Sequence, residues 1–269
     1  MWKNTKNTLQ FKFLFLVALT PKTLVNPLRQ RLQDLSMLSL KSIEYDNYAA
    51  IILGEEEKID GNLIFVKAPN GTKGERLKFA MDYLIAQNID YEYLCRFDDD
   101  DILNPLILTL YKNTKAMCIA DKHHAFFDLF TKRCLQTKRT WMANTVFLRK
   151  DCATCLMPDG RTLIEQDHAE EWMNFFKEKE VKFASKKHPI YLRVLSPTSE
   201  TANIDANNYQ NYLKSFGNWK NAKTILDFKP LIEKLNIIGK DFYKNSPIFI
   251  QREMSANSFI KRIAKRFFN

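Results

Sequence analysis

The sequence has few glycines, few cysteines and no long apolar run, and each shortage narrows the class of protein. Only seven of the 269 residues are glycine and 45% are apolar, which indicates an ordinary globular chain with ample core. The five cysteines are odd in number and scattered, so we expect reduced thiols in a cytoplasm rather than a disulfide framework. No run approaches the roughly 18 apolar residues that a membrane-spanning helix needs.

Two short patterns look like functional signals but fit a structural explanation better. Basic residues precede the apolar run at residues 13–19, as in a signal peptide, but the run is short and no A-x-A site follows it. We interpret it as the first core strand. Cys152 and Cys155 form a C-x-x-C without a second pair or a nearby pair of histidines, so we expect helix-packing residues rather than zinc ligands.

Positive charge exceeds negative charge by ten, with 41 Lys and Arg against 31 Asp and Glu. Such a surplus suits an anionic partner: nucleic acid, an acidic membrane face or a phosphorylated substrate. A nucleic-acid-binding module would gather basic and aromatic residues on one face, whereas these cations are spread along the chain and concentrated at its end. We therefore expect no nucleic-acid partner and keep that module as an alternative.

The last residues, 258–269, read SFIKRIAKRFFN and form a basic amphipathic pattern. On a helix, one side would carry Phe259, Ile260, Ile263 and Phe267, with four cations on the flanks. Such a segment suits an anionic membrane surface, where each cation contributes about 1 kcal/mol. We expect a cytoplasmic protein, peripheral on the inner face of the membrane. A docked terminal helix or a dimer contact is the alternative.

An apolar run ends abruptly in four aspartates within residues 91–105, which read YEYLCRFDDDDILNP. Two carboxylates about 4 Å apart repel by roughly 4 kcal/mol at an effective dielectric constant of about 20, so the cluster needs water, a cation or shared protons. Mn²⁺ or Mg²⁺ suits it best, because such an ion binds one or two carboxylates and takes other ligands from water and a substrate phosphate. An acidic surface turn is the alternative.

Strands and helices alternate through the first hundred residues. We expect strands at residues 13–19, 49–53, 63–66 and 91–97, and helices at residues 21–43, with a break near Asn26, and 74–87. This order predicts an α/β fold with a largely parallel sheet. Its carboxyl edge would gather Thr20, Glu55, the loop of Lys73 and the aspartates.

The rhythm changes after residue 105. We expect a helix at residues 106–115, strands at 117–120, 126–130 and 140–150, a helix with an acidic first turn at 163–177, and strands at 181–184 and 190–194. The predicted division is a nucleotide-sugar-binding and catalytic domain at residues 1–200 and an extension at residues 201–269.

The order of these parts resembles bacterial glycosyltransferases of the GT-A fold, close in layout to glycosyltransferase family 2 and similar to some rhamnosyltransferases. The matching stretches are LSMLSLKSIEYDNYAAIIL at residues 35–53 and RFDDDDILNP, in which Asp98 and Asp100 stand as the D-x-D pair with Asp101 just behind. A third is the acidic pair Glu165 and Asp167, followed by a Trp. The resemblance covers residues 11–195.

The resemblance implies a GT-A type, Rossmann-like, mostly parallel sheet with helices on both faces, followed by a C-terminal helical extension. It implies transfer of a sugar, with inversion, from a UDP- or dTDP-sugar to a glycan or glycolipid hydroxyl in bacterial surface polysaccharide or lipooligosaccharide synthesis. The metal, Mn²⁺ or Mg²⁺, would lie on Asp98, Asp100 and Asp101. Asp167 would be the base that activates the acceptor, with Glu165 as its substitute.

Donor-binding residues follow from the same resemblance. Thr20 and Pro21 would touch the nucleobase, and Glu55 would contact uracil and ribose. The remaining candidates near the nucleotide are Lys73, Arg76, Lys78, Asp98 and Arg193. A solvated helix face is the alternative for the three cations at 73–78. The family's late His is replaced by Leu195, which leaves the third metal ligand open.

A metal-dependent nucleotidyltransferase or phosphatase would also use aspartates at strand ends. Such enzymes usually add a Gly-rich phosphate loop or a second set of metal carboxylates, and neither is visible in the sequence. His168 and His188 are single histidines, for which packing or hydrogen bonding is a better explanation than metal ligation.

Overall fold

The computed structural model describes residues 8–21, 27–139, 142–196, 209, 213–214, 216–217, 220–221 and 226–245. The chain divides into two compact units, Met1–Ala125 with Lys138–Arg193 and Phe126–Thr137 with Val194–Asn269. The predicted boundary at residue 200 stays a prediction. The tail at residues 258–269 lies outside the described residues. Among the described helices, none has the length and apolarity required to cross a membrane.

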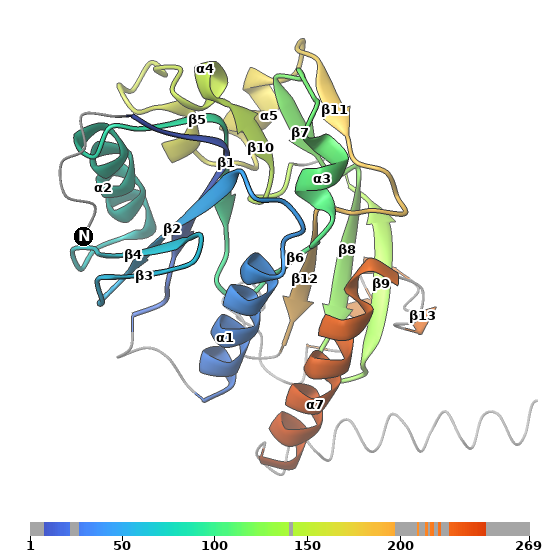
Figure 1. Ribbon diagram of the computed structural model, residues 1–269. Helices are drawn as coiled ribbons and strands as arrows, with labels where there is room; N and C mark the ends of the chain where they lie inside the picture. Colours follow the sequence, from blue (N-terminus) through green and yellow to red (C-terminus); the bar gives the residue numbers. More distant parts are fainter. Residues whose placement is uncertain are drawn as a thin grey trace, which may run out of the picture. The chain divides into compact units, whose positions relative to one another are not determined.

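The first unit is built on an eight-stranded, mostly parallel sheet in the order β11-β7-β10-β5-β1-β2-β4-β3 (Figure 1). Its strands are β1 (Leu9–Ala18), β2 (Tyr48–Gly54), β3 (Lys58–Asp60), β4 (Leu63–Lys67), β5 (Ile89–Phe97), β7 (Cys118–Ala120), β10 (Phe147–Arg149) and β11 (Val181–Phe183). Strand β1 runs parallel to both β2 and β5, and β4 runs parallel to β2, while β3 and β10 pair antiparallel with their neighbours. The predicted parallel sheet is therefore confirmed.

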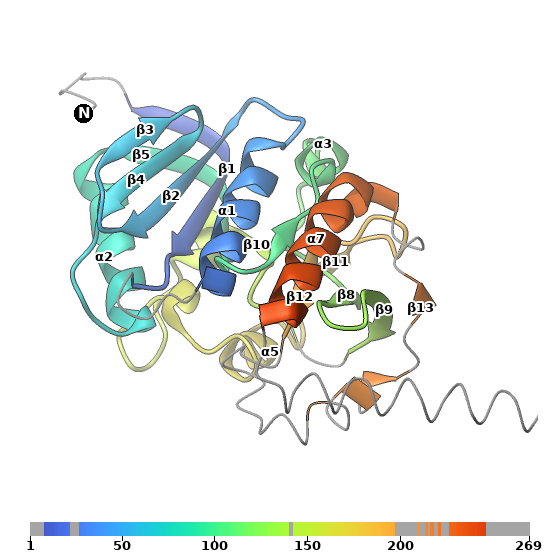
Figure 2. The same ribbon diagram turned by 90° about the horizontal axis from the view of Figure 1, so that it is seen from below.

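Helices cover both faces of this sheet, as predicted. Successive side chains of a strand point to opposite faces, so Phe13 and Phe15 of β1 pack in one core cluster and Leu14 and Leu16 in another. The phenylalanine side is covered by α1 (Pro27–Lys41) and α3 (Ile107–Tyr111), and the leucine side by α2 (Lys73–Ala86), α4 (Lys150–Ala153) and α5 (Glu171–Phe175). Figure 2 shows α1 and α2 on opposite sides of the central strands.

The register places three predicted site segments at one edge. Val17 of β1 pairs with Ile52 of β2 and with Phe97 of β5, so these strands end level with one another. The residues that follow them, Thr20, Glu55 and Asp98, therefore share the carboxyl edge. Helix α2 starts at the same edge.

A capping box fixes the start of α2. The side chain of Thr72 accepts a hydrogen bond from the backbone N–H of Glu75 at 3.3 Å, and the Glu75 carboxylate accepts one from the backbone N–H of Thr72 at 2.7 Å. Lys73 is consequently the first residue of the helix, directly after the loop that leaves β4.

The single helix predicted at residues 163–177 is wrong. The structure has a 3₁₀ helix at Leu163–Glu165, extended backbone at Gln166 (φ −80°, ψ 170°) and then the short α5. The carboxylate of Asp167 accepts hydrogen bonds from the backbone N–H groups of Ala169 at 2.6 Å and Glu170 at 3.3 Å. An aspartate that bonds its own following backbone favours a new turn over a continuous helix.

The later strands differ in extent from the prediction. The strand predicted at 140–150 is β10 alone, with residues 140–141 outside the described part, and the strand at 126–130 is β8 (His123–Asp128). In the first unit, β6 (Ile102–Leu103) pairs antiparallel with β12 (Tyr191–Leu195) through Leu103 and Tyr191.

The second unit contains β9 (Arg133–Lys138), which pairs antiparallel with β13 (Lys220–Asn221), a 3₁₀ helix at Leu226–Phe228 and α7 (Lys229–Asn245). Two contacts organise it. The hydroxyl of Tyr209 donates to the buried carboxylate of Asp128 at 2.7 Å. Gly239 of α7 lies so near the chain at Leu129 that a Cβ there would overlap the Leu129 carbonyl oxygen.

Candidate active site

The four aspartates after β5 alternate in exposure. The side chains of Asp98 and Asp100 are 31% and 17% exposed, whereas Asp99 and Asp101 are almost fully buried. The backbone N–H of Asp101 donates to the Asp98 carbonyl at 3.3 Å, which closes the stretch into a turn. The two carboxylates within reach of a bound group are therefore those of Asp98 and Asp100, the D-x-D pair of the resemblance.

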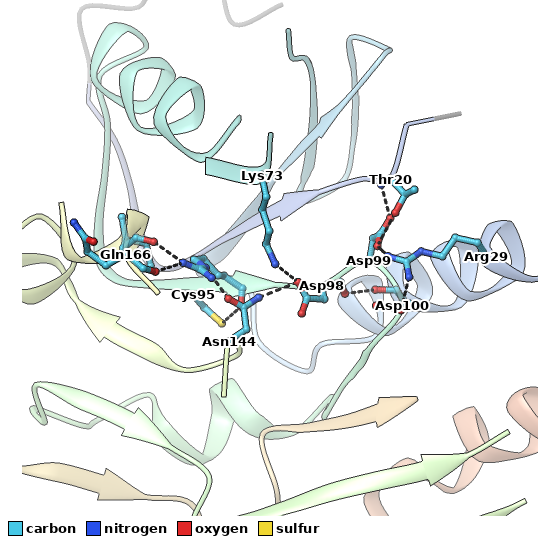
Figure 3. Close-up of polar contacts among 12 residues, drawn as sticks. Thr20, Arg29, Lys73, Cys95, Asp98, Asp99, Asp100, Asn144 and Gln166 are labelled. Carbon is cyan, nitrogen blue, oxygen red and sulfur yellow. Dashed lines mark hydrogen bonds and ion pairs between the residues drawn. The ribbon is translucent and has the colours of Figure 1, made fainter. Parts of the chain in front are cut away.

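Asp98 lies between a cation and an amide (Figure 3). Lys73 Nζ is 2.6 Å from its Oδ1, and Asn144 Nδ2 donates to the same oxygen at 2.9 Å. Burial opposes ionisation of Asp98, but Lys73, Arg96 and Arg193 together lower its pKa to about 2. Asp98 therefore carries a full negative charge at neutral pH.

Asp99 is bonded to two other elements. The backbone N–H of Thr20 donates to its carboxylate at 2.6 Å, and Gln33 Nε2 of α1 donates at 2.5 Å. Arg29, in the first turn of α1, also contacts this carboxylate. Asp99 thus links the end of β1 and the start of α1 to the aspartate turn, which is a structural role.

Asp100 pairs with the same arginine. Arg29 Nη1 lies 2.5 Å from its Oδ2. Burial raises the pKa of Asp100 to about 6, with the charges of Asp98 and Asp99 acting in the same direction and those of Arg29 and Arg193 against it. The predicted donor residue Arg193 is thus within electrostatic reach of both exposed aspartates.

Arg96, the next-but-one residue before the aspartates, is 6% exposed. Its Nε donates to Asn144 Oδ1 at 2.6 Å, and its Nη1 donates to the carbonyls of Ile164 at 3.0 Å and Gln166 at 2.8 Å. The guanidinium also lies 4.9 Å from the Trp172 ring centre, and burial lowers its pKa to about 10. It remains charged and joins the aspartate turn to the second acidic segment.

The two candidate bases have different surroundings. The Glu165 carboxylate accepts hydrogen bonds from the Thr162 N–H at 2.8 Å and the Thr162 hydroxyl at 2.5 Å, so it caps its own turn. Asp167 is exposed, and the backbone N–H of Ala169 is the main cause of its lowered pKa. Its charge acts to raise the pKa of Arg96, whose guanidinium donates to the carbonyl of Gln166 directly before Asp167.

Packing or hydrogen bonding was the role expected of His168 from the sequence, and the residue lies near this charged group. Burial lowers its pKa to about 4, and the charges of Arg96, Asp167, Asp98 and Lys73 all act on it. Its ring is edge-on to Trp172, with 6.2 Å between the ring centres. A neutral imidazole therefore stands beside the acidic segment at neutral pH.

A pocket with a volume of about 520 Å³ opens at the same edge. Four residues predicted to bind the donor line it: Thr20, Pro21, Glu55 and Arg76. Arg76 is buried, and its guanidinium donates to the carbonyls of Leu19, at 2.5 Å, and Leu53. Its position is thus fixed by the ends of β1 and β2.

The other wall of the pocket comes from α1 and from β3 and β4. It includes Gln30, Gln33, Met37, Lys58 and Phe65. The predicted donor residue Lys78 does not line the pocket. It is exposed on α2, where its Nζ lies 2.9 Å from Asp82, an ordinary pair along a helix surface.

The donor set fits a hard divalent cation in part. Asp98 and Asp100 offer carboxylate oxygens at the protein surface, and such a cation takes its other ligands from water and phosphate. Asp101 is buried. In the described part of the chain, no group of three or more His, Cys, Asp or Glu side chains is arranged to hold a metal. Lys73 and Arg29 already form ion pairs with these two partly exposed carboxylates.

Sequence reasoning missed Arg29, Asn144 and Arg96 as members of this site. Arg96 carried a readable signal, because a buried strand accepts a charged side chain only where partners satisfy it. Arg29 and Asn144 carried none, since they reach the aspartates from 71 and 46 residues away in the chain.

Comparisons with known proteins give a likeness in structure alone. No family model and no curated protein matches the sequence. Among solved structures, the chain is similar to residues 1–349 of S. aureus TarS at 11% identity and TM-score 0.45, covering 90% of this chain and 77% of that one. It is also similar to 4-diphosphocytidyl-2C-methyl-D-erythritol synthase from Anaerococcus prevotii, at 14% identity and TM-score 0.41, covering 75% of this chain and 99% of that one. A third similar structure is the glycosyltransferase GlyE of Streptococcus pneumoniae, at 10% identity and TM-score 0.41, covering 87% of this chain and 64% of that one. At these values no residue role or activity is taken from them.

Proposed function

We propose that this chain is a glycosyltransferase that transfers a sugar from a UDP- or dTDP-sugar to a hydroxyl of a glycan or glycolipid. The observation that supports this proposal is that the aspartate turn and the pocket lie at the same carboxyl edge of the sheet. The partly exposed carboxylates of Asp98 and Asp100 follow β5, and the pocket opens at the same edge without being lined by them. The hydrogen bond between Thr20, which lines the pocket, and Asp99 joins the pocket wall to the aspartate turn.

The donor is assigned to the pocket and the aspartate turn together. A volume of about 520 Å³ lies within the roughly 300–1,000 Å³ usual for small-molecule sites. The nucleoside would contact Thr20, Pro21 and Glu55, and the diphosphate would extend toward Lys73, whose ammonium is half-exposed. Lys73 would neutralise charge on the leaving diphosphate.

A bound Mn²⁺ or Mg²⁺ would stabilise the negative charge of the leaving diphosphate. Asp98 and Asp100 would hold it. The residues of the chain would otherwise bind and orient: the charge of Arg193 favours the ionised form of both carboxylates, and Asn144 fixes the Asp98 side chain by a hydrogen bond.

The acceptor is assigned to the side of Asp167. Its carboxylate is exposed and ionised at neutral pH, so it is able to accept the proton of an acceptor hydroxyl. Attack from that side, opposite the leaving diphosphate, would invert the sugar's configuration. Glu165 is less suited, because its carboxylate is engaged by Thr162.

The setting we propose is bacterial surface polysaccharide or lipooligosaccharide synthesis on the cytoplasmic face of the membrane. The charge surplus and the basic tail at residues 258–269 support it. Deleting that tail should release the protein from anionic vesicles in a pelleting assay, and unchanged pelleting would argue for a protein contact instead.

The test uses the purified full chain with Mn²⁺ and a panel of UDP- and dTDP-sugars and acceptors. Release of nucleoside diphosphate without pyrophosphate or inorganic phosphate supports glycosyl transfer. Release of pyrophosphate or inorganic phosphate instead would establish the nucleotidyltransferase or phosphatase alternative. Salt-dependent binding to oligonucleotides would favour a nucleic-acid-binding module.

A further inference from the structure

Arg29 bridges two of the aspartates with one guanidinium group. It lies in the first turn of α1, its side chain is 23% exposed, and it contacts Asp99 through Nη2 and Asp100 through Nη1 (Figure 3). A planar guanidinium is suited to such a fork, because its donors are fixed in one plane. The arginine therefore places a positive charge against the partly exposed carboxylate of Asp100.

The two aspartates depend on Arg29 to different degrees. Asp99 also accepts hydrogen bonds from Thr20 and Gln33, so it keeps partners when the arginine leaves. Within the described residues, Arg29 is the one side chain that hydrogen-bonds to Asp100. Removing the arginine would consequently free the Asp100 carboxylate while Asp99 stays bonded.

Lys73 competes less strongly than Arg29 with a divalent cation for the carboxylates. Its ammonium is half-exposed and binds Asp98 as a single point charge, and exposed pairs of this kind contribute only about 0–1 kcal/mol. Arg29 is more buried and holds two carboxylates. Of the two cations that form ion pairs with Asp98 and Asp100, Arg29 is therefore the harder one to displace.

We propose that Arg29 is an internal counter-ion of Asp100 that a divalent cation must displace, and that it sets the affinity of the site for the cation. The inference rests on the proposed function in one respect, namely that Asp98 and Asp100 are the carboxylates that receive the metal. It adds a residue that sets how tightly the metal binds.

The test is a titration of the full-length protein with Mn²⁺, followed by the loss of the electron paramagnetic resonance signal of free Mn²⁺. Arg29→Gln should bind Mn²⁺ about tenfold more tightly than the wild type, or more, because the competing charge is removed. Arg29→Lys should fall between them. The matched control is Arg149→Gln, which removes an arginine paired with Asp151 at 2.7 Å elsewhere in the same unit. It should leave Mn²⁺ affinity unchanged.

A double-mutant cycle assigns the effect to Asp100. In an Asp100→Asn background, Arg29→Gln should no longer tighten Mn²⁺ binding, because the carboxylate it competes for is gone. Equal or weaker Mn²⁺ binding by Arg29→Gln would overturn the inference, as would absence of binding in both proteins. Should Arg29→Gln fail to fold, Arg29→Lys carries the same comparison, and unchanged affinity there would overturn it.

The outcome is independent of sugar transfer. Tighter Mn²⁺ binding by Arg29→Gln in a protein that releases no nucleoside diphosphate would keep the counter-ion role and reject the glycosyltransferase. Diphosphate release with unchanged Mn²⁺ affinity would do the reverse.

Discussion

Arg96 donates a hydrogen bond to Asn144 at 2.6 Å, and Asn144 donates in turn to Asp98 at 2.9 Å. The same guanidinium donates to the carbonyls of Ile164 and Gln166, and Gln166 directly precedes Asp167. A continuous chain of contacts therefore runs from the proposed metal and donor side to the proposed acceptor side. One buried side chain, Arg96, is thus connected to both acidic segments.

Arg96→Lys should lower kcat by about a hundredfold and change donor KM little, because a lysine cannot reach both carbonyls and Asn144 together. Steady-state kinetics with varied donor check this, and thermal melting confirms that the variant is folded. Arg149→Gln serves as the control. A rise in donor KM at constant kcat would contradict a role in positioning Asp167.

Substitutions of Asp98 and Asp100 should affect turnover, whereas a substitution of Asp99 should affect stability. Asp98→Asn and Asp100→Asn should each reduce turnover by a hundredfold or more and change the free energy of unfolding by less than about 1 kcal/mol, since their charged partners Lys73 and Arg29 are partly exposed. Asp99→Ala should lower the free energy of unfolding by about 1–3 kcal/mol, because the backbone N–H of Thr20 and the buried amide of Gln33 lose their acceptor. Denaturant unfolding measures both. Equal effects on stability would contradict the division.

Asp167→Asn should cut kcat by about a hundredfold or more while donor binding is kept, which is the usual weight of a general base. Glu165→Gln should keep near-normal kcat, because its carboxylate acts as a local cap for Thr162. Kinetics and equilibrium donor binding are measured on both variants. A near-normal rate in Asp167→Asn together with a large loss in Glu165→Gln would reverse the assignment.

Asp121 gives a dependence of stability on pH. It is buried, its two oxygens lie 3.1 and 3.0 Å from the Ile190 N–H, and burial raises its pKa to about 8 against those hydrogen bonds. The folded protein keeps a proton that the unfolded chain releases above pH 4 or so. The free energy of unfolding should therefore fall as pH rises from about 4 to about 8, by up to about 1.4 kcal/mol per pH unit. Urea unfolding of Asp121→Asn should show a flatter profile, and an unchanged slope would exclude this carboxyl.

Two helical glycines should respond in opposite directions to alanine. Gly239→Ala should destabilise the protein by about 1–3 kcal/mol, because the added methyl group overlaps the Leu129 carbonyl. Gly74→Ala, in α2, meets only Thr72 Oγ1 at 4.0 Å and should stabilise by about 0.5–1 kcal/mol. Thermal melting compares them, and a neutral Gly239→Ala would contradict the close approach of α7.

The sequence predicted those elements and site residues whose positions follow from a local pattern of apolar and polar residues. Continuous apolar runs located β1, β2, β4 and β5, and helical spacing located α2, so the carboxyl edge with Thr20, Glu55 and Asp98 followed from chain order. The split after Glu165 was not predictable, because the apolar spacing continues across it while the Asp167 side chain starts a new turn. The roles of Arg29 and Asn144 depend on distant folding contacts, which leave no local pattern.

The guanidinium of Arg76 is held by the carbonyls of Leu19 and Leu53, where β1 and β2 end. Two neighbouring strand ends are thereby tied together by one side chain that is itself part of the pocket wall. A nucleoside entering there would meet a pocket wall whose shape is already fixed by main-chain contacts. Selection among nucleobases would then come from rejecting shapes that do not fit, rather than from closure around the right one.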